Sequence, residues 1–135
     1  MNPLLQQFHE QIRLANRESE GGQGIVHDTD GPVRRRYPVT PGTSYAMVES
    51  PAGLGEDPDY WIARTAGFFA DRDERVEWKT YSYDQPDDLG ERLSRNGFQA
   101  EDREALLLGE ATTLIHDAPL PAGLTMREAD SPQDF

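Results

Sequence analysis

The sequence has 135 residues, and its 13 Lys and Arg side chains against 25 Asp and Glu side chains give a formal net charge of −12 at pH 7. A field of this sign repels phosphate, which argues against general binding to nucleic acid or to an anionic membrane surface. The absence of cysteine excludes disulfide bonds, thiolate metal sites and a cysteine nucleophile, and it favours a cytoplasmic location. Hydrophobic residues make up 36% of the chain, below the usual ~45–50%, which indicates a small core under a large polar surface.

The N-terminal segment has the pattern of an amphipathic helix over residues 3–17. Asn2 can cap this helix, and Pro3 suits its first position, where no amide hydrogen is needed. Its apolar face carries Leu4, Leu5, Phe8, Ile12 and Ala15. Its polar face carries Gln6, Gln7, Glu10 and Arg13. The glycine-rich stretch that follows predicts a flexible linker, so residues 1–23 form an N-terminal helix and linker.

From Gly24 onward the pattern becomes that of a sheet. Two runs rich in strand-forming residues, 25–27 and 33–37, flank Asp30-Gly31-Pro32, which predicts a turn between two strands. Residues 44–48 are short and almost uncharged, which is typical of a central strand. This part of the chain therefore predicts a hairpin followed by a third strand.

Helix and strand alternate in the region that follows. Asp57 and Pro58 open a helix with an inner stripe of large apolar side chains, and residues 76–80 alternate in polarity as a strand does. A further helix begins at Pro86, and Ala105–Leu108 has the composition of a final apolar strand. Such alternation implies right-handed crossovers and parallel neighbours, so we predict an α/β fold with a mixed sheet flanked by helices.

Two local signals refine this prediction. Asn96, Gly97 and Phe98 predict a helix end in which Gly97 takes the left-handed conformation and Phe98 folds back onto Leu93. The largest aromatic side chains of the region are expected in the core instead of around a ligand. They are Trp61, Phe68, Phe69 and Trp78.

The composition changes again beyond Ala111, where prolines and a glycine mark a linker. Residues 124–128 have the pattern of an opening strand, and residues 131–135 have that of a starting helix. We therefore expect a domain over residues 24–116 and, in residues 117–135, a linker with the start of a truncated second domain.

One loop could hold an anion. Gly53-Leu54-Gly55 lies between a predicted strand and a helix N-terminus, where backbone amides and the helix dipole can bind phosphate. The acidic residues Glu56, Asp57 and Asp59 would repel that anion, and an ordinary turn also explains the glycines. We favour the turn and keep phosphate binding as the alternative.

The other candidate clusters also have structural explanations. The basic run at residues 34–36 alternates between the two sides of a strand, which favours a solvated edge strand over an anion or partner contact. The carboxylates Asp84, Asp87 and Asp88 suit the positive end of a helix dipole. The three histidines lie far apart in the sequence and lack the spacing of metal ligands, so we expect no metal site.

The stretch Tyr45–Glu110 resembles the second half of a GNAT (Gcn5-related N-acetyltransferase) domain. The segment Leu89–Phe98, with its Asn96-Gly97-Phe98 end, is similar to the LYEKxGF helix end of that family. With Val76–Tyr81 included, the chain resembles the N-terminal domain of a bacterial two-domain GNAT protein, in which a diverged first domain precedes a second GNAT domain. The resemblance implies a GNAT-like fold, with residues 120–135 similar to the linker and first strand of the second domain.

The resemblance also shows what has diverged. The family binds the acetyl-CoA pyrophosphate with a Q/R-x-x-G-x-G/A loop, which corresponds here to Ser50, Gly53 and Gly55, with serine in place of the long polar residue. The tyrosine that often protonates the leaving thiolate corresponds to Leu93, which has no proton to donate. Glu49, at the end of the central strand, is the one candidate base. Loss of a positioned acid costs about 10²–10⁴-fold in rate, so the resemblance implies a domain that has lost catalysis.

We therefore expect a diverged GNAT-like domain of an acetyltransferase that is non-catalytic on its own and serves packing, substrate gating or oligomerisation. Its partner would be a catalytic GNAT domain or a second copy of the chain, which would associate through an exposed apolar patch. No cofactor is expected on this chain. Two alternatives remain: an active small N-acetyltransferase that uses acetyl-CoA, and a standalone interaction module without enzymatic activity.

Overall fold

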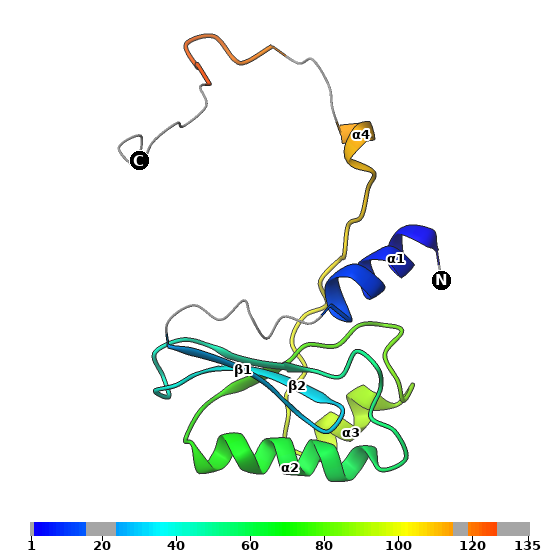
Figure 1. The fold of residues 1–135 in the computed structure, drawn as a ribbon, viewed down its shortest axis with the longest axis vertical. Coiled ribbons are helices and arrows are strands. Elements are labelled where there is room, and N and C mark those ends of the chain that lie inside the picture. Colours follow the sequence, from blue (N-terminus) through cyan, green and yellow to red (C-terminus); the bar gives the residue numbers. More distant parts are fainter. Residues whose placement is uncertain (1, 16–23, 115–118, 127–135) are drawn as a thin grey trace.

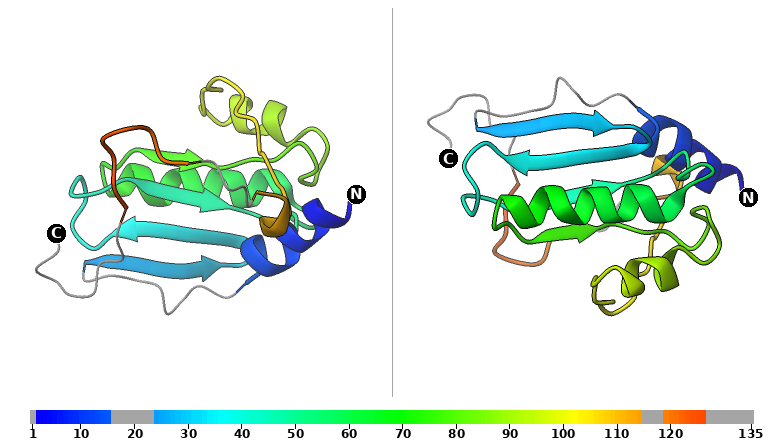
Figure 2. Two further views of the ribbon diagram at one scale, coloured as in Figure 1. Left: turned by 90° about the horizontal axis from the view of Figure 1, so that it is seen from above. Right: turned by 90° about the horizontal axis from the view of Figure 1, so that it is seen from below.

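The computed structural model describes residues 2–15, 24–114 and 119–126 (Figure 1). The strands are β1 (Ile25–Asp30), β2 (Val33–Pro38), β3 (Ala46–Glu49) and β4 (Val76–Trp78). The helices are α1 (Pro3–Phe8), the π-helix η1 (His9–Arg13), α2 (Pro58–Asp71), α3 (Leu89–Arg95) and α4 (Ala111–Leu114). Helix α2 covers one face of the sheet, whereas α1 and η1 lie on the other side, at one end of the sheet (Figures 1 and 2).

The described strands form one mixed sheet in the order β1-β2-β3-β4. Strands β1 and β2 are an antiparallel hairpin, β2 and β3 are also antiparallel, and β3 and β4 are parallel. Helix α2 connects the two parallel strands, because parallel neighbours need a crossover connection. The predicted mixed α/β class is confirmed. The predicted edge strand at residues 34–36 is wrong, because β3 pairs with β2 on its second side.

The core lies between the sheet and α2. The ring of Tyr37 on β2 meets Phe68 and Phe69 of α2 edge to face, at centroid distances of 5.3 and 5.9 Å. Of the aromatic residues predicted for the core, Phe69 and Trp78 are buried, and Trp61 and Phe68 pack against the core partly buried. The buried hydrophobic residues are Val33, Tyr37, Ala46, Val48, Leu54, Ile62, Phe69, Trp78, Leu89 and Leu93.

Helix α3 ends as its sequence predicts. Gly97 adopts a φ of 91°, the left-handed conformation that glycine takes without a Cβ clash. The N–H of Phe98 donates to the carbonyl of Leu93 at 3.1 Å, and the N–H of Gly97 donates to the carbonyl of Ser94 at 3.2 Å. These two bonds form a Schellman motif, which satisfies carbonyls that the helix leaves free.

The N-terminal helix is shorter than predicted. It continues from α1 into η1, where the N–H of Leu14 donates to the carbonyl of His9 at 2.8 Å, and helical structure ends at Arg13. Residues 16 and 17 of the predicted helix lie outside the described residues. Within α1 and η1, which the structure describes throughout, Arg13 is the one buried residue.

The predicted strand at Ala105–Leu108 is wrong. Residues 99–110 form neither helix nor strand, and the side chain of Leu107 is 88% exposed. The segment meets the region of β4 through an ion pair between Lys79 and Glu104 at 2.6 Å, and no backbone ladder joins them. An apolar composition was therefore not sufficient to add a strand to the sheet.

Little of the C-terminal prediction falls on residues that the structure describes. Residues 124–126 form no strand, and residues 127–135, with the predicted helix start, lie outside the described residues. The division into residues 1–23, 24–116 and 117–135 stays a prediction.

The turn between β1 and β2 packs against α2 through Gly31. Gly31 has a φ of 59°, and a Cβ at this position would overlap the indole ring of Trp61. Gly42 also has a positive φ, of 79°, but a Cβ there would meet no atom within 4 Å. Substitution of Gly42 therefore introduces backbone strain alone, whereas substitution of Gly31 introduces both backbone strain and steric overlap.

Gly31→Ala is expected to destabilise the protein more than Gly42→Ala. Both substitutions place a side chain in the left-handed region, which costs about 1–2 kcal/mol. Only Gly31→Ala adds an overpacked contact, which costs about 1–3 kcal/mol more. Urea unfolding followed by tryptophan fluorescence measures the difference, and equal effects of the two substitutions would contradict tight packing between the turn and α2.

Candidate functional site

The parallel strands β3 and β4 end side by side, and ligands of α/β proteins commonly bind beyond the carboxyl ends of such strands. Glu49 is the last residue of β3, and Ser50, Gly53 and Gly55 follow in the loop before α2. All four candidate residues predicted from the sequence therefore lie at or just beyond the end of β3.

The glycine loop is a tight turn that contacts the segment after β4. The N–H of Gly53 donates to the carbonyl of Ser50 at 2.9 Å, and Gly53 has a φ of 81°. A Cβ on Gly53 would lie 3.5 Å from the Cβ of Gln85. Ser50 is 1% exposed, and its Oγ has no hydrogen-bond partner among the described residues. Neither the Gly53 amide nor the Ser50 hydroxyl is therefore turned toward solvent to meet an anion.

Carboxylates already occupy the amino end of α2. The Oδ1 atom of Asp57 accepts the N–H of Tyr60 at 3.2 Å, which satisfies one of the free amides of the first turn. Asp59 forms an ion pair with Arg92 of α3. A phosphate at this helix end would compete with one carboxylate and be repelled by both. These contacts fit an ordinary turn better than a phosphate site.

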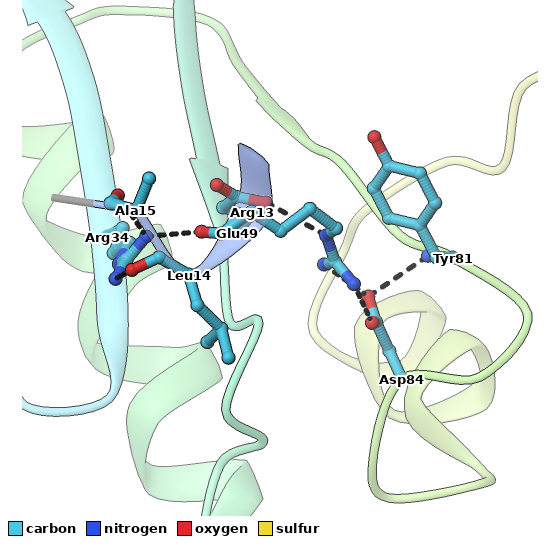
Figure 3. Close-up of polar contacts among 7 residues, drawn as sticks. All are labelled: Arg13, Leu14, Ala15, Arg34, Glu49, Tyr81 and Asp84. Carbon is cyan, nitrogen blue, oxygen red and sulfur yellow. Dashed lines mark hydrogen bonds and ion pairs between the residues drawn. The ribbon is translucent and has the colours of Figure 1, made fainter. Parts of the chain in front are cut away.

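The guanidinium of Arg13 bridges the end of β3 and the turn after β4 (Figure 3). Its Nη1 and Nη2 atoms donate to Oδ1 and Oδ2 of Asp84 at 2.6 and 3.1 Å. Its Nε atom donates to Oε2 of Glu49 at 3.4 Å. The side chains of Arg13 and Asp84 are each 2% exposed, so these carboxylates replace the water that the guanidinium has lost.

Two tyrosine rings complete the surroundings of Arg13. The guanidinium carbon lies 4.0 Å from the ring centroid of Tyr81 and 5.3 Å from that of Tyr83, within the range of cation–π attraction. Burial lowers the pKa of Arg13, but interactions with its neighbours, chiefly with Asp84 and then with Tyr83, outweigh this effect and leave the pKa raised. Arg13 is therefore a permanent cation. Glu49, Tyr81, Tyr83 and Asp84 are called the arginine cage below.

A second arginine holds the backbone at the end of η1. Arg34 of β2 donates to the carbonyls of Arg13, Leu14 and Ala15, the last two at 2.9 and 3.1 Å. The helix itself leaves these carbonyls free, and a positive charge complements the negative end of the helix dipole. The N-terminal helix is therefore attached to the sheet by one buried arginine and one capping arginine.

The other arginines of the run at residues 34–36 have separate contacts. Arg35 donates to the carboxylate of Asp28 through Nε and Nη2, at 2.7 and 2.9 Å. Burial raises the pKa of Asp28, but the hydrogen bonds that it accepts, chiefly from Arg35, lower the pKa by more. Arg36 lies over the ring of Tyr45, at 4.7 Å from the centroid. The run is therefore not one anion-binding patch.

Neither partner of the central ion pair has the role that the sequence predicts for it. The helical period predicts Arg13 on the polar face, but the π-turn of η1 holds more residues per turn and changes the direction in which Arg13 points. Asp84 was assigned to a helix dipole, whereas its carboxylate binds Arg13. The two residues are 71 positions apart, and no local sequence signal connects them.

Among the described residues, no group of three or more His, Asp or Glu side chains is placed to hold a metal ion. Within the same ranges, each helix is too short or too polar to cross a membrane. Comparison with known proteins gave no match to a family model, to a curated protein or to a solved structure. The resemblance to GNAT domains therefore depends on the sequence motifs alone.

Asp84→Ala is expected to destabilise the protein by about 3–5 kcal/mol, because it leaves the buried guanidinium of Arg13 without its main partner. Asp87→Ala, at an exposed carboxylate three positions along, serves as the control and should change stability by less than about 0.5 kcal/mol. Urea unfolding monitored by circular dichroism measures both. Similar unfolding midpoints for the two variants would contradict a central role for the ion pair.

Proposed function

We propose that the chain is a diverged GNAT-like domain of a cytoplasmic acetyltransferase, that it has no catalysis of its own, and that it packs on a catalytic GNAT domain and shapes its substrate opening. One observation carries the proposal. Beyond the ends of β3 and β4, where a ligand would bind, Arg13 of the same chain lies between Glu49 and Asp84. A buried internal ion pair at this position suits a structural role.

The groups that acetyl transfer would need are engaged in other contacts. The Gly53 amide of the family's pyrophosphate loop closes a turn onto Ser50. Leu93, at the position of the family's proton donor, is 6% exposed and packs in the core. Glu49, the remaining candidate base, faces the guanidinium of Arg13. These contacts support a domain without catalysis.

Packing on another domain requires an exposed apolar surface, and the segment Leu106–Leu108 provides one. The three leucines are 44%, 88% and 38% exposed. An open groove beside them is lined by Leu108 and by apolar side chains of the N-terminal helix, among them Leu4, Phe8 and Ile12. Exposed apolar patches on small proteins often mark interaction surfaces. We assign this patch to contact with the catalytic domain or, without it, with a second copy of the chain.

Acetyl-CoA is expected to leave the melting temperature of the chain unchanged up to about 1 mM, the upper end of common Michaelis constants. A ligand at 100 times its dissociation constant would add about 2.7 kcal/mol of stability, which a melting curve detects readily. Sodium pyrophosphate at matched ionic strength controls for general anion effects. A saturable rise with acetyl-CoA, absent with pyrophosphate, would overturn the proposal and favour the active acetyltransferase.

The standalone interaction module differs from the proposal in its partner. Affinity capture of the full chain from its native host should recover an acetyltransferase domain if the proposal is right. Reproducible capture of other proteins without one would favour the standalone module.

Leu107→Asp is expected to weaken self-association of the isolated chain by tenfold or more. Burial of a leucine contributes roughly 1.5–3 kcal/mol, and about 1.4 kcal/mol is a factor of ten in affinity. Val39→Asp, at another residue that is 61% exposed, is the matched control. Sedimentation velocity over a concentration series measures both variants. A wild-type chain that stays monomeric, or equal effects of the two variants, would contradict the assignment of this patch.

A further inference from the structure

The guanidinium of Arg13 occupies the arginine cage in the way that a bound ligand would. Arg13 is the one buried residue of α1 and η1, whereas the adjacent residues in the sequence, Ile12 and Leu14, are 45% and 37% exposed. The helical segment Pro3–Arg13 is shorter than the ~12–15 residues at which an isolated helix becomes even marginally stable in water. The position of this segment therefore depends on the cage and on the few contacts around it.

Among the described residues, the other contacts of this segment with the sheet and the turn after β4 lie close to the cage. The ring of Phe8 is 5.7 Å from that of Tyr81, and the ring of His9 is 5.5 Å from that of Tyr83. Arg34 adds the bonds to the last carbonyls of the helix. The N-terminal helix thus contacts the sheet around one arginine, as a peptide with a single anchor residue does.

The cage is held by hydrogen bonds that do not involve the N-terminal helix. The N–H of Tyr81 donates to Oδ2 of Asp84 at 3.0 Å, and the N–H of Asp84 donates to the carbonyl of Tyr81 at 2.9 Å. Glu49 is held within β3, in register with Arg34 of β2. The first two bonds orient the Asp84 carboxylate, and strand pairing fixes the backbone of Glu49, so neither depends on a bond to Arg13.

The chemistry of the cage selects a guanidinium over an ammonium ion. Both oxygens of Asp84 accept parallel hydrogen bonds, a geometry that matches the planar fork of arginine. A third donor, Nε, points to Glu49, and the ring of Tyr81 lies 4.0 Å from the guanidinium carbon. A lysine ammonium offers no planar fork and cannot make the paired bonds to Asp84 while it lies on the ring.

We propose that the arginine cage is an arginine-binding site, that the N-terminal helix is its resident internal ligand, and that an arginine side chain on a cationic partner segment takes the cage when this helix is displaced. The net charge of −12 attracts such a segment and repels an acidic one. The inference extends the proposed function, on which it rests, by naming the chemistry of the partner segment.

The test uses the full chain with Arg13 replaced by alanine, which leaves the cage vacant, and adds a small guanidinium compound. Arg13→Ala should melt at a lower temperature than the wild type, and millimolar ethylguanidinium should raise its melting temperature saturably. The wild type, with its cage filled, should show no such rise. The double variant Arg13→Ala/Asp84→Asn should also fail to respond. Ethylammonium at the same concentration is the matched probe, and an equal response to ethylammonium, or no response to ethylguanidinium, would overturn the inference.

A peptide probe extends the test to the helix itself and covers the case in which Arg13→Ala does not fold. A fluorescent peptide of residues 2–15 is titrated against Arg13→Ala or, where that chain is unfolded, against Arg13→Lys. Fluorescence anisotropy should show binding about tenfold tighter than to the wild type, in which the internal helix competes for the cage. The same peptide with Arg13→Lys should bind about tenfold more weakly. Equal affinity of the two peptides, or no binding to either variant, would overturn the inference.

The two proposals fail separately. A saturable rise of the melting temperature with acetyl-CoA would contradict the proposed non-catalytic function. It would not affect the result with ethylguanidinium. If ethylguanidinium did not raise the melting temperature of Arg13→Ala, the arginine-binding site would be contradicted. The acetyl-CoA result would be unaffected.

Discussion

The buried ion pair between Arg13 and Asp84, together with the bonds that Arg34 donates, holds the N-terminal helix on the sheet. Removing a guanidinium from water costs several kcal/mol, and the cost is tolerable only where carboxylates and hydrogen bonds replace the lost solvent. Here the replacement comes from Glu49 at the end of β3 and from the turn after β4. Parallel pairing of β3 and β4 brings these two ends together, so the burial of this charge depends directly on the topology of the sheet.

The charged groups around this ion pair also limit the ligands that the strand ends can accommodate. Carboxylates line the end of β3, the turn after β4 and the amino end of α2, where Asp57 and Asp59 lie. Arg13 and Arg92 offset part of this charge, and the remainder opposes a phosphate-bearing cofactor. The glycine loop adds to this effect, because the Gly53 amide that could have faced an anion closes a turn onto Ser50 instead. Charge and backbone geometry at this edge of the sheet therefore both disfavour an anionic ligand.

Much of the fold could be predicted because its signals are local. Strand-forming runs around a turn, an uncharged run and the alternation at residues 76–80 located the strands, and Gly97 placed the end of α3. The site was only half predictable: Glu49 and the loop after it lie at the strand end as expected, but the guanidinium that Glu49 faces comes from a distant helix. The composition of residues 9–13 does not indicate the π-turn that changes the direction of Arg13. The apolar pattern of residues 105–108 could not show whether a neighbouring strand would pair with them.

The π-turn of η1 also has a consequence for how this protein can vary in evolution. Successive side chains of this turn point in different directions, so the loss of one residue between His9 and Arg13 would change the direction of the guanidinium relative to its carboxylate. Substitutions on the outer side of this helix leave that direction unchanged, whereas a single insertion or deletion does not. Among homologous chains, the number of residues in this segment should therefore be better preserved than their identities.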